Sequence, residues 1–218
     1  MIFKRCVMVM VLGWMALLLL AGCQRMDKVE GSKHFQIKTP AVRQAQLAKI
    51  NTWRIHGAFS IKQEGQKAQI ASYSWNQIKK NYRIRISSML NLYHIEIFRE
   101  YGTVTLWNNT THVSTAKTPE ALMQNALGWS LPVSEMSDWI KGAPAKKAGR
   151  YEAQYDPSGH LILLRQAGWV LHFSAYKTHT TDVDFPKMIL MERPGFSVKI
   201  VIINWLLPLE YKQMEVIG

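Results

Sequence analysis

Cysteine is nearly absent from this chain: only Cys6 and Cys23 occur among its 218 residues, and both lie near the N-terminus. A framework of disulfide bonds, which supports many small secreted folds, is therefore excluded for the rest of the chain. The fold must be held together by its hydrophobic core. The chain is long enough to bury a substantial core as one domain.

Motifs of the common catalytic centres are also missing. The chain contains no G-x-S-x-G, no H-E-x-x-H, no P-loop and no G-x-G-x-x-G sequence. His179 with Asp182 comes nearest to a catalytic pair, but this threonine-rich stretch offers no serine partner, and His112 has no acidic residue beside it. We expect no catalytic centre, no metal site and no cofactor.

Long apolar runs are scarce, and the clearest one lies at the N-terminus. Lys4 and Arg5 precede Val7–Leu20, a run too short to cross a bilayer comfortably. A positive start, a short apolar core and small residues are typical of a secretory signal peptide. The sequence Leu20-Ala21-Gly22-Cys23 resembles a bacterial lipobox. The alternatives are an ordinary cleaved signal, or an uncleaved anchor with a chance cysteine.

The lipobox implies a signal peptide over residues 1–22 and a mature chain that begins at Cys23. In proteins with this motif the cysteine thiol receives a diacylglycerol and the new amine is acylated. Several acyl chains anchor a protein stably, whereas one chain binds only marginally. Gln24 follows where inner-membrane lipoproteins often carry Asp, which favours the periplasmic face of the outer membrane. Residues 23–39 are mostly polar and without periodicity, so they predict a flexible tether.

Acidic residues are few: 15 Asp and Glu stand against 27 Lys and Arg, a formal net charge of +12. A periplasmic location argues against nucleic acid as the partner. Anionic lipid headgroups or acidic protein surfaces are better targets for these charges. The basic residues are scattered along the sequence, however, and a solvated face explains them equally simply.

The apolar pattern predicts mostly strands. After a predicted helix over Ala41–Asn51, the period changes from that of a helix to two residues. Further helices are predicted from Thr118 to Gly128 and over Ser134–Lys141, with a hydroxyl cap, an early proline and glycine stops. The alternating runs are Ile55–Ile61, Tyr82–Ile86, Tyr93–Ile97, Tyr151–Tyr155, Leu161–Gln166, Trp169–Tyr176, Lys187–Glu192 and Phe196–Trp205.

These runs predict an α+β fold with an antiparallel meander of about ten strands. One face of this sheet is expected to be buried and the other to be exposed to solvent. The run Phe196–Trp205 is apolar on both faces over much of its length, so we expect it to be covered on both sides. So few helices cannot obviously fill the apolar face. Curvature would leave a cavity for an apolar ligand, and a fully packed core is the alternative.

The mature chain resembles the LolB family of outer-membrane lipoprotein receptors over nearly its whole length. No single matching piece is specific, but their order and spacing together are. The matching residues are Gly57-Ala58-Phe59, Trp75, Gln77, Tyr82-Arg83-Ile84, Gly128-Trp129, Pro132, Trp139, Gly142, Pro144, Gln166, Gly168-Trp169, Tyr176, Pro186 and Trp205.

The resemblance implies a strongly curved, unclosed antiparallel β-barrel of about ten or eleven strands over residues 40–205, with a few helices covering its concave apolar face. It also implies a non-catalytic monomer that accepts cargo lipoproteins from the periplasmic carrier LolA. Their acyl chains would be bound in the cavity and then inserted into outer-membrane lipid. The family gives no role for the tail, residues 206–218.

The family carries a loop with an exposed leucine that delivers cargo into the membrane. The matching stretch here is Ser88-Met89-Leu90-Asn91, in which Leu90 takes the leucine position and Met89 stands beside it. The usual proline and glycine around the leucine are replaced by Met89 and Asn91. Asn tolerates a positive φ better than most residues. The alternative is that Met89 and Leu90 continue the preceding strand as core residues.

Cavity-lining residues are expected on the dry sheet face and on the inward stripes of the two covering helices. Large aromatics are mostly core packing, which is the alternative for each of them, whereas methionine adapts its shape to varied apolar ligands. The expected lining residues are Trp75, Tyr82, Ile84, Leu122, Met123, Leu127 and Trp139.

Two other functions fit the same residues. A static envelope scaffold would share the lipobox and the sheet but would lack a cavity. A carrier of another amphiphile, such as a glycolipid, would share the cavity too, and only the family match favours lipoprotein transfer over it.

Overall fold

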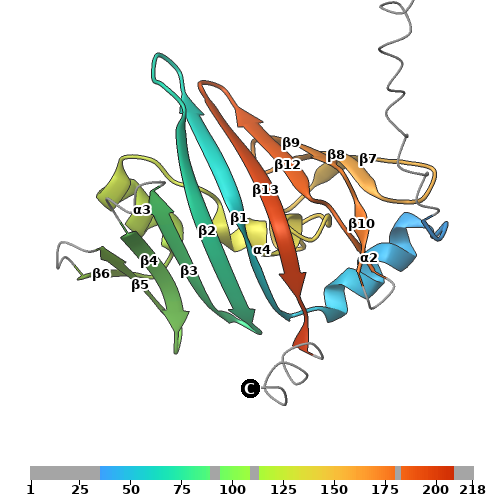
Figure 1. Ribbon diagram of the computed structural model, residues 1–218, viewed down its shortest axis with the longest axis horizontal. Helices are drawn as coiled ribbons and strands as arrows, with labels where there is room; N and C mark the ends of the chain where they lie inside the picture. The colour runs from blue at the N-terminus through green and yellow to red at the C-terminus, as the bar shows by residue number, and fades with distance from the viewer. Residues whose placement is uncertain (1–34, 89–93, 109–112, 180–182, 209–218) are drawn as a thin grey trace, which may run out of the picture. The chain divides into compact units, whose positions relative to one another are not determined.

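One large antiparallel sheet dominates the computed structural model, which describes residues 35–88, 94–108, 113–179 and 183–208. All of these residues belong to one compact unit, Phe35–Gly218, which holds the whole described core. Eleven described strands form the sheet in the order β6-β5-β4-β3-β2-β1-β13-β12-β9-β8-β7, and the short strands β10 and β11 pair separately (Figure 1).

The strands alternate with short turns and are interrupted twice by helices. The helices are α2 (Pro40–Lys49), α3 (Pro119–Leu127) and α4 (Val133–Trp139). The strands are β1 (Thr52–Gln63), β2 (Gln69–Ile78), β3 (Asn81–Ser88), β4 (His94–Glu100), β5 (Thr103–Asn108), β6 (Val113–Ala116), β7 (Tyr151–Tyr155), β8 (Leu161–Gln166), β9 (Trp169–Ser174), β10 (Lys177–Thr178), β11 (Asp184–Phe185), β12 (Met188–Arg193) and β13 (Phe196–Leu206).

The pairing of β1 with β13 joins two meanders that lie far apart in the sequence. The register of this pair shifts between His56 and Gly57. A Cβ atom at Gly57 would lie 1.9 Å from the carbonyl oxygen of Val201, so only glycine permits this approach. The bulge increases the local twist, which bends the sheet at its centre.

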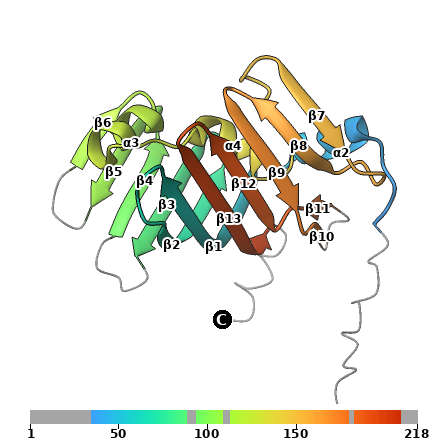
Figure 2. The ribbon, with the colours of Figure 1, turned by 90° about the horizontal axis from the view of Figure 1, so that it is seen from above.

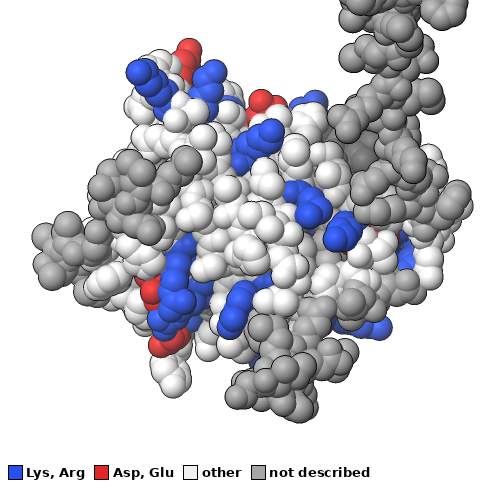
Figure 3. Space-filling model, viewed as in Figure 1, with Lys and Arg blue, Asp and Glu red and all other residues white. Residues whose placement is uncertain are grey.

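The two faces of the sheet differ in polarity because side chains alternate along each strand. Ile55, Trp75, Ile84, Ile97 and Leu106 lie opposite one another across β1 to β5, and all are buried. We call these five residues the apolar row. The opposite face is solvated, and Figure 3 shows its Lys and Arg side chains dispersed over the visible surface.

Helices α3 and α4 cover the apolar side of the sheet. Both views place them on the same side of the strands (Figures 1 and 2). The Oγ1 atom of Thr118 accepts a hydrogen bond from the Ala121 amide at the start of α3, and Gly128 ends this helix with φ 74°. These are the start and stop that the sequence predicts.

A buried polar network fastens α2 to the far end of the sheet. The Arg43 guanidinium donates to Asp184 at 2.5 Å, to the Ser158 carbonyl at 2.8 Å and to the Gln36 carbonyl at 2.7 Å. The His160 ring lies between Asp184 and Asp156, with both contacts at 2.9 Å. The network ties α2 to the turn between β7 and β8 and to β11.

The α+β class and the unclosed, curved antiparallel sheet agree with the sequence expectation. The strands β2, β5, β6, β10 and β11 were not among the predicted runs. The expectation that Phe196–Trp205 is covered on both sides was wrong: Ile203 on the outer face is 57% exposed. Strand β13 pairs with β1 on one edge and with β12 on the other. The helices cover only its inner face.

We expect Asp184→Asn to lower the free energy of unfolding by about 3–5 kcal/mol, because Arg43 is left buried without its carboxylate. Burial alone would raise the pKa of Asp184, but hydrogen bonds from Thr178, His160 and Arg43 hold this pKa below its usual value. The ionised carboxylate of Asp184 therefore stabilises the fold at pH values above the ordinary Asp pKa, about 3.9. This contribution is lost as the pH falls below that value.

Urea unfolding at about pH 7 and about pH 3 measures this effect. The difference in stability between the two pH values should be smaller in the Asp184→Asn variant than in the wild type. Glu152→Gln, at a mostly exposed side chain, is the control and should change stability by less than about 1 kcal/mol. An equal loss in both variants would contradict the assignment.

Candidate functional site

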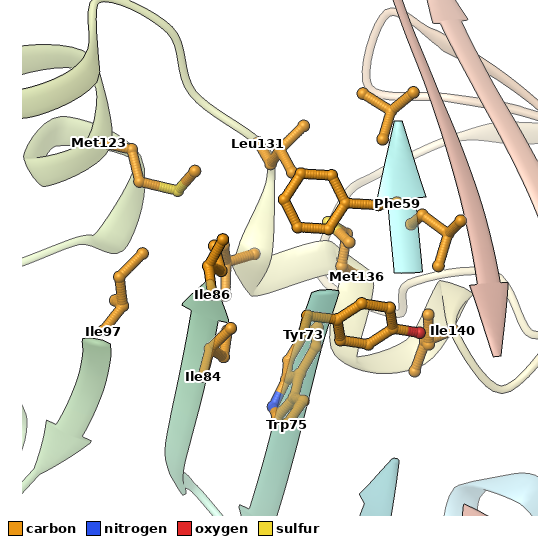
Figure 4. Close-up of a pocket in the computed structure, with 13 residues that line it drawn as sticks. Phe59, Tyr73, Trp75, Ile84, Ile86, Ile97, Met123, Leu131, Met136 and Ile140 are labelled. Carbon is orange, nitrogen blue, oxygen red and sulfur yellow. The ribbon is translucent and has the colours of Figure 1, made fainter. Parts of the chain in front are cut away.

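An apolar cavity lies between the concave face of the sheet and the covering helices (Figure 4). Its volume is about 500 Å³, and part of this space is open to solvent. The lining residues are Phe59, Tyr73, Trp75, Ile84, Ile86, Ile97, Met123, Leu131, Val133, Met136, Ile140, Val198 and Ile200.

The floor of the cavity comes from β1 to β4 and β13, and its roof from α3, α4 and the segment between them. Figure 4 shows Met123 and Leu131 pointing toward the side chains of the sheet, with Phe59 and Tyr73 beside them. The phenol of Tyr73 is the one polar group in this lining besides the Trp75 indole. Burial raises the pKa of Tyr73, so its hydroxyl stays protonated, and it donates to the Val201 carbonyl at 3.4 Å.

The Trp75 indole is also satisfied within the protein. Its Nε1 donates to Oε1 of Gln77 at 3.0 Å, and the amide of Gln77 donates in turn to the Lys79 carbonyl at 2.8 Å. The cavity wall therefore offers an incoming molecule apolar contact and few free hydrogen-bonding groups. Such a wall suits hydrocarbon and disfavours a polar ligand.

The roof is built from adaptable side chains. Met123 of α3 and Met136 of α4 are unbranched and fit apolar surfaces of varied shape. The two roof helices are linked by a hydrogen bond from the Ser134 amide to the Glu120 carboxylate at 3.0 Å, at an exposed position. Helix α4 is also anchored by a buried hydrogen bond from Trp139 to Gln166. Helix α3 is therefore the part of the roof that can shift most easily to enlarge the space below it.

The structure places three of the predicted lining residues, Trp75, Ile84 and Met123, in the cavity wall. Leu122 is buried outside that wall. Trp139 is buried too, and its Nε1 donates to Gln166 at 2.8 Å, so it anchors α4 to β8. Tyr82 lies on the same face of the sheet, beyond the end of the apolar row.

Four other predicted site residues cannot be placed. Leu127 belongs to α3, but its side chain lies outside the described part of the structure. Cys23, Met89 and Leu90 also fall outside the described residues. Lipidation of Cys23 and membrane insertion through Met89 and Leu90 stay predictions.

Most of the lining residues contributed by the roof and by β13 were not among those predicted from the sequence. Ile86 and Ile97 were within reach, since they continue the alternation of Ile84 and Ile95. Leu131 was not, because it lies in an irregular segment between two helices where no periodicity marks its direction. Val198 and Ile200 were also predictable, since they alternate with the polar residues Ser197 and Lys199.

Metal chemistry finds no support in the described residues, where no group of three or more His, Cys, Asp or Glu side chains is arranged to hold an ion. The described helices are also each too short or too polar to span a bilayer. The polar cluster that most resembles a metal site is the one around His160, which lies at another part of the sheet. Both ring nitrogens of His160 are already hydrogen-bonded, to Asp156 and to Asp184.

Comparison with known proteins identifies the family. The model of the outer membrane lipoprotein LolB family matches residues 51–205, which is most of the chain. The chain belongs to the LolB family. The match begins just before β1 and ends near the end of β13, so it takes in both strands of the central pair and the whole cavity.

Two relatives named outer-membrane lipoprotein LolB support this assignment. The protein from Coxiella burnetii (strain RSA 493 / Nine Mile phase I) is 44% identical over 190 residues, 86% of this chain and 88% of the relative. The protein from Cellvibrio japonicus is 32% identical over 165 residues, 74% of this chain and 81% of the relative. The family and the outer-membrane lipoprotein class expected from the sequence are thus confirmed.

A solved structure shows a similar fold. The crystal structure of a DUF1329 family protein from Desulfovibrio piger superposes with a TM-score of 0.51 at 13% identity. The superposition covers 78% of this LolB-family chain and 91% of the other chain. At this identity the likeness concerns the fold alone.

We expect Leu131→Trp to weaken the binding of an apolar fluorescent probe at least about fivefold, because a larger side chain in a packed site costs about 1–3 kcal/mol. The dissociation constant from a fluorescence titration measures this change. Ile203→Trp makes a similar change on the solvated face and should leave probe binding unaltered. Equal dissociation constants in both variants would place the probe elsewhere.

Proposed function

We propose that this LolB-family protein accepts lipoproteins from the periplasmic carrier LolA and inserts them into the outer membrane. The acyl chains of the cargo are bound in the apolar cavity between the sheet and the helices α3 and α4. The observation that supports this most is the wall itself, in which the polar atoms of Tyr73 and Trp75 are already hydrogen-bonded within the protein.

The energetics of acyl chains favour a direct handover. Each methylene group moved out of an apolar environment into water costs about 0.8 kcal/mol, so a free chain in water is prohibitively unstable. The chain must therefore pass from one apolar environment directly to another. A cavity that binds acyl chains more tightly than the carrier, and less tightly than a bilayer, drives this transfer without a nucleotide.

The cavity must widen to hold cargo, since its space of about 500 Å³ includes the open mouth. The groups that can move are the side chains of Met123, Leu131 and Met136 and the helix α3, since Trp139 anchors α4 to β8. Backbone hydrogen bonds between the strands fix the register of the sheet below. Cargo binding therefore displaces the roof and leaves the strand register unchanged.

The lipid anchor and the loop at Leu90 supply the final step. The anchor on Cys23 and the tether, residues 23–39, keep the domain close to the membrane at the periplasmic face. Insertion of one leucine gains roughly 1.5–3 kcal/mol. This is too little to hold a protein on a membrane, but it is enough to bias a tethered domain toward inserting its loop.

The first test is transfer of a labelled lipoprotein. A soluble chain that begins at residue 24 keeps the entire compact unit Phe35–Gly218. Mixed with LolA that carries the labelled lipoprotein, this chain should take up the label, and Leu131→Trp should take up less. Label that stays on LolA while the chain is folded would favour a scaffold, or a carrier of another amphiphile.

The second test separates acceptance from delivery. In the lipid-anchored protein, Leu90→Glu should accept cargo from LolA at the wild-type level, because Leu90 is not needed to bind acyl chains. Its delivery of cargo to vesicles should fall about tenfold or more, since a charged side chain opposes insertion. Leu90→Ile is the matched control. A Leu90→Glu variant that no longer accepts cargo would contradict this division of roles.

A further inference from the structure

Directly beyond the apolar row, the concave face becomes polar. Gln77 of β2, Tyr82 of β3 and Arg99 of β4 lie opposite one another, two residues along each strand from Trp75, Ile84 and Ile97. We call these three residues the polar row. Residues that are opposite in an antiparallel pair share a face, and two residues span about 7 Å along a strand. The polar row therefore ends the floor of the cavity.

The hydroxyl of Tyr82 is buried without a hydrogen-bond partner among the described residues. Its ring packs against Trp75 with a centroid distance of 6.3 Å, so the phenol extends from the apolar wall. Burial, and then the Glu120 carboxylate, raise the pKa of Tyr82, while Arg99 lowers it, and the net shift is upward. The hydroxyl is thus a protonated donor, and leaving such a group unpaired is costly.

Arg99 is also unpaired within the part of the chain that the structure describes: it makes no ion pair and no side-chain hydrogen bond there. The arginines of the outer face differ. Arg83 pairs with Glu96 and Glu100, and Arg85 pairs with Glu96. Arg83 and Arg85 on the outer face are therefore neutralised, whereas the guanidinium of Arg99 on the inner face has no such partner among the described residues.

A hollow of about 710 Å³, open to solvent, adjoins the polar row. Tyr82 and Arg99 both line it, together with Asn76 and Ile78 of β2, Asn81 and Arg83 of β3, Glu100 of β4, and Tyr101 in the turn that follows β4. Both residues therefore border open space, but the Tyr82 hydroxyl itself is buried and becomes accessible only when the roof shifts, as the proposed function requires. One side of Tyr82 meets this hollow, and the other meets the wall of the apolar cavity.

We propose that Tyr82 and Arg99 form a headgroup site that binds the acyl ester carbonyl oxygens of the cargo lipoprotein. The inference rests on the proposed function. A cargo lipoprotein carries the same modification expected at Cys23, a diacylglycerol whose chains are joined through ester groups. Ester carbonyls accept hydrogen bonds and cannot donate, which matches a site that offers one hydroxyl and one guanidinium.

The site fixes how far the chains enter. With the ester groups at the polar row, each acyl chain runs along Ile84 and Ile97 toward Met123. The peptide part of the cargo then remains in the solvent-open hollow. The Glu120 carboxylate, whose charge raises the pKa of Tyr82, disfavours an anionic headgroup at the same place.

The test compares two lipopeptides of equal chain length: a diacyl form with ester links to the glycerol and a dialkyl form with ether links. The ether probe lacks the carbonyl oxygens but keeps the chains. The chain from residue 24 should bind the ester probe about tenfold more tightly, as expected for two hydrogen bonds that include a charged donor. Tyr82→Phe and Arg99→Met should each reduce this ratio, and the double variant should bring it close to one.

Arg85→Met is the matched control, because Arg85 lies on the outer face of β3. It should leave the ratio at the wild-type value. Thermal unfolding checks that every variant is folded, and binding of the ether probe checks that its cavity is intact. Tyr82→Phe keeps the ring and removes only an unpaired hydroxyl, so its fold should be preserved.

Three results would overturn the headgroup site. If the wild-type chain binds the ester and the ether probe equally, the headgroup site is contradicted but the proposed function is not. A chain that binds neither probe would instead reject acyl binding itself. Ether-linked phosphatidylglycerol is the third probe: if Arg99→Met loses it while the ester-to-ether ratio is unchanged, the site binds a phospholipid phosphate.

Discussion

The pairing of β1 with β13 is the constraint on which the rest of the structure depends. These strands begin and end the sheet in the sequence, yet they lie side by side at its centre. Their union converts two separate meanders into one concave surface. It also demands a glycine at position 57, since the carbonyl of Val201 occupies the space of any Cβ there. A cavity under α3 and α4 exists only because this junction holds the two halves together.

The chemistry of the concave face is arranged in rows across the strands. Because opposite residues share a face, one register decides the neighbours of every inward side chain. The apolar row supplies contact for hydrocarbon, and the polar row supplies donors at its end. An amphiphile has the same order of parts, with chains joined to an oxygen-rich head. The register of the sheet therefore matches the layout of the proposed cargo.

Much of the fold was predictable, because strand alternation and helix caps are local signals. Thr118 and Gly128 mark α3 in the sequence as they do in the structure. The cavity was less predictable. Trp139 and Trp75 are the same residue type, yet Trp75 lines the cavity and Trp139 does not. What distinguishes Trp139 is its hydrogen bond to Gln166, 27 residues away, which makes it an anchor for α4. Such long-range partners are fixed by topology, which a local pattern does not contain.

The sheet, as far as it is described, ends at β6 and β7 without joining them. In a closed barrel the strand number and the stagger together set the radius, so the interior has a fixed size. An open sheet has no such condition, and its curvature follows the twist between neighbouring strands, which tolerates a wide range of angles. Small changes of twist at each strand pair add up across the sheet. The width of the concave face is therefore not set by closure, and it can change while every strand pair keeps its register.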